Sequence, residues 1–127
     1  MDRQSNMVGW FEIPVNDMDR AKTFYESVFE IKISINDLDG LLMGWFPSAP
    51  GKSGAMGSLV KHPTYIPSDT KGAVLYFSCK DLSDELSRVE EAGGAILQPK
   101  KEIGGGHGFM ALLKDTEGNR IALHSQN

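Results

Sequence analysis

The hydrophobic positions of the first thirty residues predict a strand followed by a helix. Residues 8–15 are apolar apart from one acid, which is a β pattern, and Asn16 and Asp17 are favourable helix N-cap residues. From Met18 to Phe29 apolar side chains recur at helical spacing, with charged residues on the opposite face. The sequence therefore predicts a strand over about 8–15 and a helix over about 17–29.

Three further apolar segments follow this helix and predict three strands. Ile31, Ile33 and Ile35 alternate with polar residues as in a half-buried strand, and residues 36–40 are typical of a turn before a second strand over 41–46. Residues 47–54 predict a loop, and residues 55–61 predict a fourth strand. The order of elements in the first half is therefore βαβββ.

The second half repeats this order. Residues 72–79 predict a strand, an apolar stripe from Leu82 to Ala92 predicts a helix over about 82–92, and Gly93 closes it. Three more strands are expected over about 95–99, 109–113 and 120–124.

A shift of 64 positions aligns the two halves. It places Asp17 on Asp81 and Gly54 on Gly118, each at the same point of its βαβββ unit, so we infer an internal duplication. The predicted fold is α+β, with two tandem βαβββ modules whose mixed sheets pair into one concave surface, in a single domain over 1–127. The modules are expected over about 7–62 and 72–125, and the concavity is the natural ligand site.

Composition narrows the possible partners and locations. Thirteen Lys and Arg against 17 Asp and Glu give a net charge of −4, and no basic run is present, so nucleic acid is not expected as a partner. The single cysteine excludes an internal disulfide framework and a Cys-rich zinc site. Residues 1–6 are polar and no long apolar run follows, which predicts a cytoplasmic protein with no membrane partner.

Two segments carry a resemblance to a known family. They are Gly9-Trp-Phe-Glu-Ile-Pro-Val15, followed by Asp17-Met-Asp-Arg-Ala21, and Lys114-Asp-Thr-Glu-Gly-Asn-Arg-Ile121. In them the chain resembles the vicinal oxygen chelate superfamily, which holds glyoxalase I, extradiol dioxygenases, fosfomycin resistance enzymes and bleomycin resistance proteins. The resemblance implies a U-shaped cleft, usually in a homodimer, and a metal held by His or Glu from the first and last strand of each module.

The resemblance also locates the four metal-ligand positions in this chain. They fall on Trp10, Ser58, Val74 and Ala122, none of which is a His, Glu or Asp. A divalent metal needs about three or four imidazole, carboxylate or thiolate donors. We therefore expect no bound metal and no cofactor.

Two polar side chains near these positions are candidates for chemistry. Glu12 shares a strand face with Trp10 and is a candidate general base or cation contact; equally, it forms an ion pair with Arg120 or Lys61 at the sheet edge. His124 is a candidate acid, base or replacement metal donor, or else a surface histidine near the C-terminus.

Aromatic residues complete the predicted site. Trp10, Trp45, Tyr76 and Phe109 are candidates for an aromatic cleft lining, although aromatic residues in strands often belong to the core. His107 lies in a glycine-rich stretch, residues 104–108, that is a candidate cap over a ligand.

Three functions are consistent with this pattern. The first is a metal-free small-molecule-binding protein of the bleomycin-resistance type that takes an aromatic or cationic metabolite or drug. The second is a glyoxalase-like lyase or isomerase, or a dioxygenase-related enzyme, with a rebuilt or metal-independent site that uses Glu12 or His124. The third is a dimeric interaction module. A homodimer is expected in each case from the resemblance and from the open sheet edges.

Overall fold

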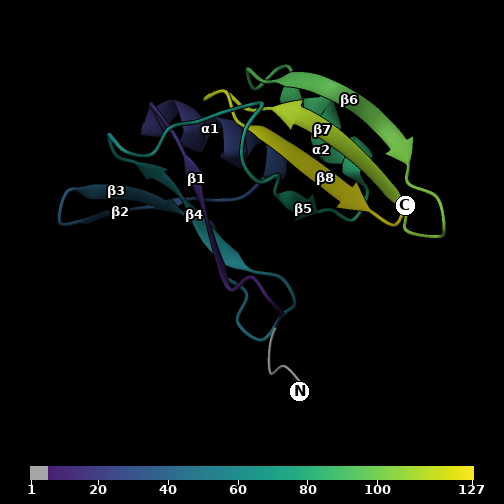
Figure 1. Cartoon of the computed structure of the whole chain (residues 1–127), viewed down its shortest axis with the longest axis horizontal. Helices are drawn as coiled ribbons and strands as arrows, with labels where there is room; N and C mark the ends of the chain where they lie inside the picture. The colour runs from purple at the N-terminus through teal and green to yellow at the C-terminus, as the bar shows by residue number, and fades with distance from the viewer. Residues whose placement is uncertain (1–5) are drawn as a thin grey trace.

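The computed structural model describes residues 6–127, and its elements follow the predicted order (Figure 1). The first half contains β1 (Trp10–Pro14), α1 (Met18–Phe29), β2 (Ser34–Leu38), β3 (Leu41–Trp45) and β4 (Met56–Lys61). The second half contains β5 (Tyr76–Ser78), α2 (Leu82–Val89), β6 (Ala95–Glu102), β7 (Phe109–Lys114) and β8 (Arg120–Ser125).

The strands form two mixed sheets of four strands each. Their orders are β1-β4-β3-β2 and β5-β8-β7-β6, with the first strand of each module parallel to the last. The register repeats as well: Glu12 lies opposite Ser58, and Tyr76 lies opposite Ala122, with both pairs separated by the same 64 positions. The predicted α+β fold of two tandem modules is confirmed.

The strand predicted around Ile31 to Ile35 is displaced in the structure. Strand β2 begins only at Ser34, because the backbone N–H of Ile33 donates to the Glu26 carboxylate at 2.8 Å and Ile33 packs in the core beside α1. The turn is correspondingly tighter than predicted. It consists of Asp39 and Gly40, whose φ angles of 53° and 85° are those of a two-residue hairpin turn.

Two strands of the second module differ in length from the prediction. Strand β5 has only three residues, although the flanking Cys79 N–H still donates to the carbonyl of His124 in β8. Strand β6 runs to Glu102 rather than Pro99, because register shifts between Ile96 and Lys101 keep it paired with β7 through a bulged region. Helix α2 ends at Val89, short of the predicted residue 92.

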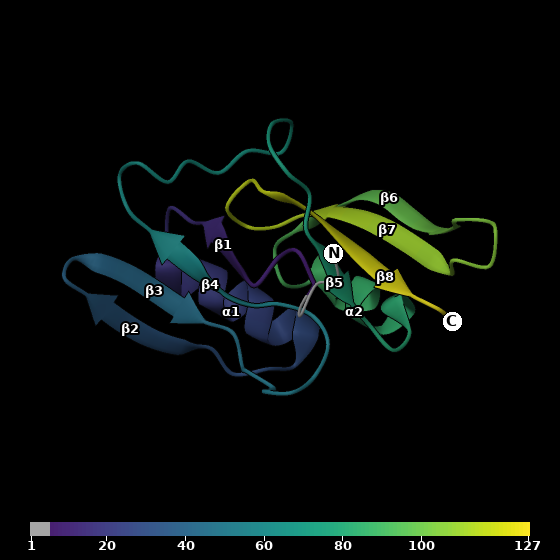
Figure 2. The same ribbon diagram turned by 60° about the horizontal axis from the view of Figure 1, so that its bottom comes forward.

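The two sheets share one core, but over residues 6–127 no strand of one sheet is hydrogen-bonded to a strand of the other. Strands β1 and β5 are the inner edges of their sheets, and α1 contacts α2 (Figure 2). Phe11 of β1 and Phe77 of β5 meet edge to face with ring centroids 5.8 Å apart. The Phe77 ring also packs against Tyr25 and Phe29 of α1, with ring centroids 6.2 and 4.9 Å away. Aromatic packing therefore joins the modules across the gap between their sheets.

The turn between β7 and β8, residues 115–119, contacts the start of α1, and we call it the clasp hairpin. Asp115 accepts a 2.6 Å hydrogen bond from the buried Tyr25 hydroxyl, and Asn119 donates to the carbonyl of Pro14 at 2.7 Å. Burial raises the pKa of Tyr25 well above its ordinary value, and the nearby Asp115 carboxylate raises it further. This hydroxyl is therefore a permanent donor, which suits a structural contact.

Glu117 makes the strongest contacts of this hairpin. Its carboxylate accepts the backbone N–H groups of Asn16 and Asp17, each at 2.8 Å, and pairs with Arg20 Nε at 2.7 Å. Burial alone would raise the pKa of Glu117, but the hydrogen bonds from Arg20, from the two backbone N–H groups and from Thr116 outweigh it and lower the pKa. The carboxylate also supplies negative charge at the N-terminus of α1, where the helix dipole favours it.

No helix among residues 6–127 has the length and apolar character needed to cross a lipid bilayer.

Candidate functional site

The face of the first sheet that points away from α1 carries two partly exposed tryptophans. Because Phe11 packs into the core, its neighbours Trp10 and Glu12 point to the opposite side, which we call the open face. Strand β4 separates Trp10 from Trp45, yet the two indoles meet edge to face with centroids 5.7 Å apart. They remain 41% and 40% exposed, so two aromatic surfaces are available to a ligand.

Glu12 lies beside this pair and has two polar partners. It accepts a hydrogen bond from the Tyr65 hydroxyl at 2.9 Å and a longer one from Trp10 Nε1 at 3.4 Å. Within residues 6–127 it forms no ion pair with Arg120 or Lys61, so that alternative reading of Glu12 is not found. The carboxylate is exposed rather than enclosed by an apolar wall.

Tyr65 is a site residue that sequence reasoning did not identify. It lies in the connection between the modules, 53 residues from Glu12, and no local pattern links the two. Its hydrogen bond to Glu12 raises the pKa of the Tyr65 phenol. The connecting loop therefore forms one wall of the site.

The four positions where the resemblance places metal ligands do not supply a donor set. Ser58 is fully buried and its hydroxyl has no hydrogen-bond partner in the described chain. Trp10, Val74 and Ala122 have no donor that binds a divalent metal. No group of three or more His, Cys, Asp or Glu side chains suited to a metal ion occurs over residues 6–127. The residues present do not fit the metal of the superfamily.

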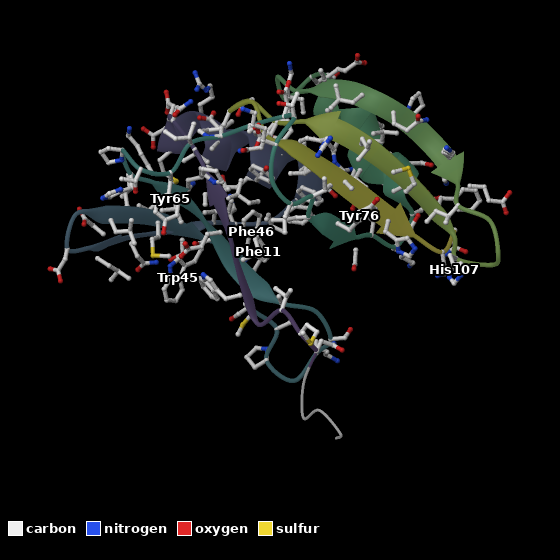
Figure 3. All side chains as sticks on the ribbon, viewed as in Figure 1. Phe11, Trp45, Phe46, Tyr65, Tyr76 and His107 are labelled. Atoms are coloured by element: carbon white, nitrogen blue, oxygen red, sulfur yellow. The ribbon has the colours of Figure 1, made fainter. Side chains whose placement is uncertain are left out.

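The other predicted site residues belong to the second sheet. Tyr76 is 56% exposed on the open face of β5, and His124 lies on the same face of β8. Phe109 instead packs against the core, with the Lys100 ammonium 4.7 Å above its ring. Figure 3 shows Trp45 and His107 at opposite ends of the molecule, with Tyr76 between them. A single chain thus groups Trp10, Glu12 and Trp45, but it does not bring them to His107.

His124 and His107 are linked through the glycine-rich connection between β6 and β7. The His124 Nε2–H donates to the His107 carbonyl at 2.7 Å. Gly104, Gly105, Gly106 and Gly108 all have positive φ angles, which a loop of residues with side chains would not adopt readily. His124 holds this loop against β8.

Three adjoining hollows follow the gap between the inner edges of the two sheets, and together we call them the seam groove. An apolar hollow of about 200 Å³ is lined by Phe11, Phe46 and Phe77, and the next, of about 400 Å³, shares Phe11 and Phe77 with it. The third, of about 420 Å³, also includes Phe11 and is lined by Lys71 and Arg120. Trp10 and Glu12 line this third hollow, so the seam groove begins beside the tryptophan pair.

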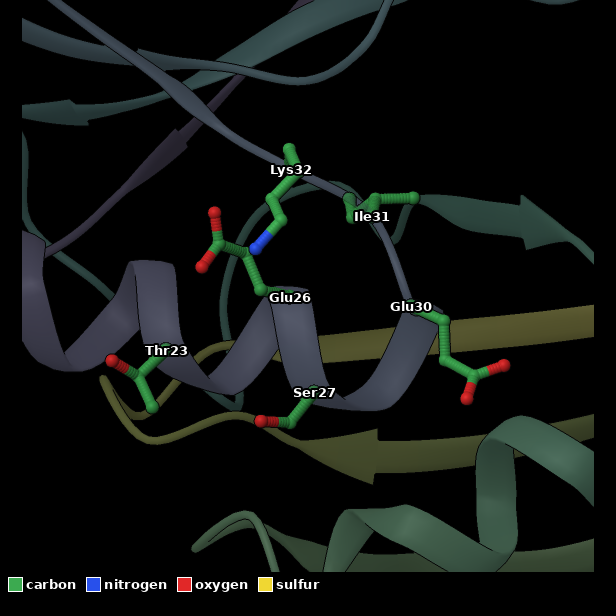
Figure 4. A pocket seen from close by; sticks show the side chains of 6 residues that line it. All are labelled: Thr23, Glu26, Ser27, Glu30, Ile31 and Lys32. Carbon is green, nitrogen blue, oxygen red and sulfur yellow. The ribbon is translucent and has the colours of Figure 1, made fainter.

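A further hollow of about 450 Å³ lies at the C-terminal end of α1 (Figure 4). Glu26, one of the two acids that line it, already has partners. The Ile33 N–H and Lys22 both donate to its carboxylate, and the backbone hydrogen bond is the main cause of its lowered pKa. Glu26 there supports the local fold, and we place the candidate site at Trp10, Glu12 and Trp45.

The chain belongs to the Glyoxalase/Bleomycin resistance protein/Dioxygenase superfamily, whose family model matches residues 7–123. No functionally curated protein sequence matches the chain significantly. The matched residues include both βαβββ modules and the clasp hairpin.

Several solved structures share the fold at low sequence identity. Glyoxalase I from Zea mays has a TM-score of 0.71 and 20% identity over 92% of this chain, which spans only 45% of the maize protein. TnmS3, an antibiotic binding protein from Streptomyces sp. CB03234, has a TM-score of 0.69 and 24% identity, with 98% of each chain covered. A glyoxalase/bleomycin resistance protein from Albidiferax ferrireducens T118 has a TM-score of 0.71 and 17% identity, over 94% of this chain and 98% of that one.

Proposed function

We propose that this protein binds small molecules without a metal and that its ligand is an aromatic or cationic metabolite or drug. The observation that carries the proposal is the pair of partly exposed indoles, Trp10 and Trp45, beside the Glu12 carboxylate on the open face. Indole faces offer stacking area and attract cations, and a nearby carboxylate adds charge selectivity. The likeness in fold to an antibiotic binding protein that matches the chain end to end supports the same class of function.

The donor chemistry supports the metal-free part of the proposal. At the four metal-ligand positions of the superfamily, this chain has a buried serine hydroxyl and three side chains that cannot coordinate a metal. The site is therefore suited to recognition by shape and charge. Metal analysis of protein purified without chelator should therefore find less than one-tenth equivalent of Zn, Ni, Fe or Mn per chain. One equivalent that survives gel filtration would contradict it.

An enzymatic role finds less support. Glu12 and His124 lie on the open faces of different sheets, and none of the hollows of the seam groove is lined by His124. An acid and a base that act on one substrate need to reach the same atoms.

We also propose a homodimer that covers part of the open faces. Met56 and Tyr76 are 42% and 56% exposed, and the outer strands β2 and β6 each leave one edge unpaired in the described chain. Exposed apolar side chains and free edges favour a partner surface. Light scattering at micromolar concentration should give twice 13.9 kDa, and a monomeric mass throughout would refute this part.

Two variants test the ligand site. After a thermal-shift screen of small aromatic and cationic compounds has identified a ligand, Trp10→Ala should weaken neutral and cationic ligands alike, because stacking area is lost. Glu12→Gln should weaken cationic ligands by about tenfold, the effect of losing one charged contact, and should change neutral ligands little.

The controls are an apolar and an acidic substitution elsewhere. Leu97→Ala removes a side chain that is 46% exposed on β6, and Glu90→Gln removes an exposed carboxylate at the end of α2. Both should bind the ligand as the wild type does. Wild-type affinity in the Trp10 and Glu12 variants would place the site elsewhere.

A further inference from the structure

The seam groove has a strongly uneven distribution of charge. Among the described residues, the apolar and middle hollows contain no ionisable side chain other than Tyr76. The charged side chains Glu12, Lys71 and Arg120 all line the third hollow. A molecule that fills the groove would therefore meet charge at one end only.

Arg120 is the least satisfied of these charged groups. Its Nε is buried and has no hydrogen-bond partner among residues 6–127, and neither Arg120 nor Lys71 takes part in an ion pair there. Its neighbour on β7, Lys114, is different, because it pairs with Asp69 at 3.7 Å. A buried guanidinium donor without an acceptor is costly unless a ligand supplies one.

Glu12 does not neutralise this end of the groove. Its carboxylate is held by the Tyr65 hydroxyl and by Trp10 Nε1, and two cations stand against this one acid. The neighbouring polar groups are also occupied, since the Asn119 amide donates to Pro14. The unmet requirement is for an anion that accepts from a planar guanidinium, which a carboxylate does with two parallel bonds.

From these observations we propose that the seam groove binds an organic acid with an extended apolar body. Its carboxylate lies at Arg120 and Lys71, and its apolar body runs past Phe11 into the hollow that Phe46 and Phe77 line. The aromatic rings offer apolar contact to this body, and the groove meets the tryptophan face only at Trp10 and Glu12, which line its charged hollow. This site goes beyond the function proposed above, which concerns an aromatic or cationic ligand at Trp10 and Trp45.

Dodecanoate is a suitable probe, and calorimetric titration of the full chain is a suitable assay. We expect one dodecanoate to bind per chain, with dodecylammonium and acetate at least tenfold weaker, because the first reverses the charge and the second lacks the body. Failure of dodecanoate to bind at millimolar concentration, or equal affinity for dodecylammonium, would overturn the proposal.

Substitutions at the two ends of the groove locate the ligand. Arg120→Gln should weaken dodecanoate by about ten- to hundredfold, the usual effect of losing hydrogen bonds to a charged group. Ala55→Phe fills the point where the apolar and middle hollows join, and it should weaken dodecanoate by a similar factor while leaving Arg120 intact. Wild-type affinity in both variants would refute the site.

Matched variants separate this site from folding effects and from the tryptophan face. Lys114→Gln removes a cation next to Arg120 that does not line the groove, and it should bind dodecanoate normally. Lys71 lies in an exposed connection, so Lys71→Gln tests the carboxylate contact even if Arg120→Gln fails to fold. We expect Lys71→Gln to weaken dodecanoate binding a few-fold. Trp45→Ala should impair only the ligand of the open face, so the two proposals fail independently.

Discussion

The substitution Glu117→Gln tests whether the clasp hairpin holds the two modules together. The carboxylate accepts five hydrogen bonds: from Asn16 N (2.8 Å), Asp17 N (2.8 Å), Arg20 Nε (2.7 Å), Arg20 Nη2 (3.1 Å) and Thr116 Oγ1 (3.0 Å). Glutamine retains one accepting oxygen, which can keep the two backbone bonds. Its amide group then faces the Arg20 donor, so the charged contact is lost.

The size of the effect follows from these contacts. Hydrogen bonds to charged groups contribute about 1.5–3 kcal/mol, and a buried unsatisfied donor costs about 1–3 kcal/mol. The Glu117 side chain is fully buried, but that of Arg20 is 51% exposed, so water replaces part of the lost interaction. We expect the free energy of unfolding to fall by about 2–3 kcal/mol, which for a chain of this length lowers Tm by about 7–11 °C.

Acid provides a second signature of the same contact. Because the pKa of folded Glu117 is lowered, its contribution to stability is complete above the unfolded carboxyl pKa of about 4.3 and is lost as the pH falls through the folded value. The stability difference between wild type and Glu117→Gln should therefore be largest near neutral pH and should shrink below about pH 4.

Urea denaturation followed by circular dichroism and tryptophan fluorescence measures both effects. Glu90→Gln is the matched control, since it removes one carboxylate at an exposed position with no ion pair or side-chain hydrogen bond among the described residues. If Glu117→Gln were no less stable than Glu90→Gln, or if its deficit persisted unchanged in acid, the clasp would not depend on this charge.

Two further predictions concern the core. Gly57→Ala should cost about 1–3 kcal/mol, because a Cβ there would lie 2.5 Å from the Phe11 ring and the Phe11 carbonyl oxygen, whereas Gly9→Ala meets nothing within 4 Å; equal urea midpoints for the two would disprove this. Burial raises the pKa of the Cys79 thiol to about 12, so native protein at pH 8 should react with a disulfide reagent far more slowly than protein unfolded in urea, and equal rates would contradict the burial.

Local patterns predicted the secondary structure well where the hydrophobic period was unambiguous. Helix α1 begins one residue after its predicted start, because Asp17 caps it, and its buried residues Met18 and Phe24 follow the helical stripe. The alternation at Ile31 and Ile33 predicted a strand that begins too early. The backbone N–H of Ile33 donates to Glu26, seven residues earlier in α1, and period-two spacing does not reveal this contact.

The candidate site was predictable only in part. Trp10 and Glu12 share a face because side chains alternate along any strand, so the sequence was sufficient to group them. Tyr65 reaches Glu12 through the connecting loop, and it carries no local signal for that position. The sequence suggested Arg120 as an ion-pair partner of Glu12; the two line the same hollow but form no ion pair among residues 6–127.

The sequence by itself determined the repeated βαβββ order, because hydrophobic period, N-caps and turn residues act within a few positions of the chain. It also determined which side chains stand at the positions of the superfamily's metal ligands. Only the tertiary structure decided that the two sheets stay separate, that Glu117 clasps the start of α1, and that Arg120 faces a groove without an ion-pair partner in the described chain. These contacts join residues about 50 to 100 positions apart, and their geometry depends on how the modules pack rather than on any local preference.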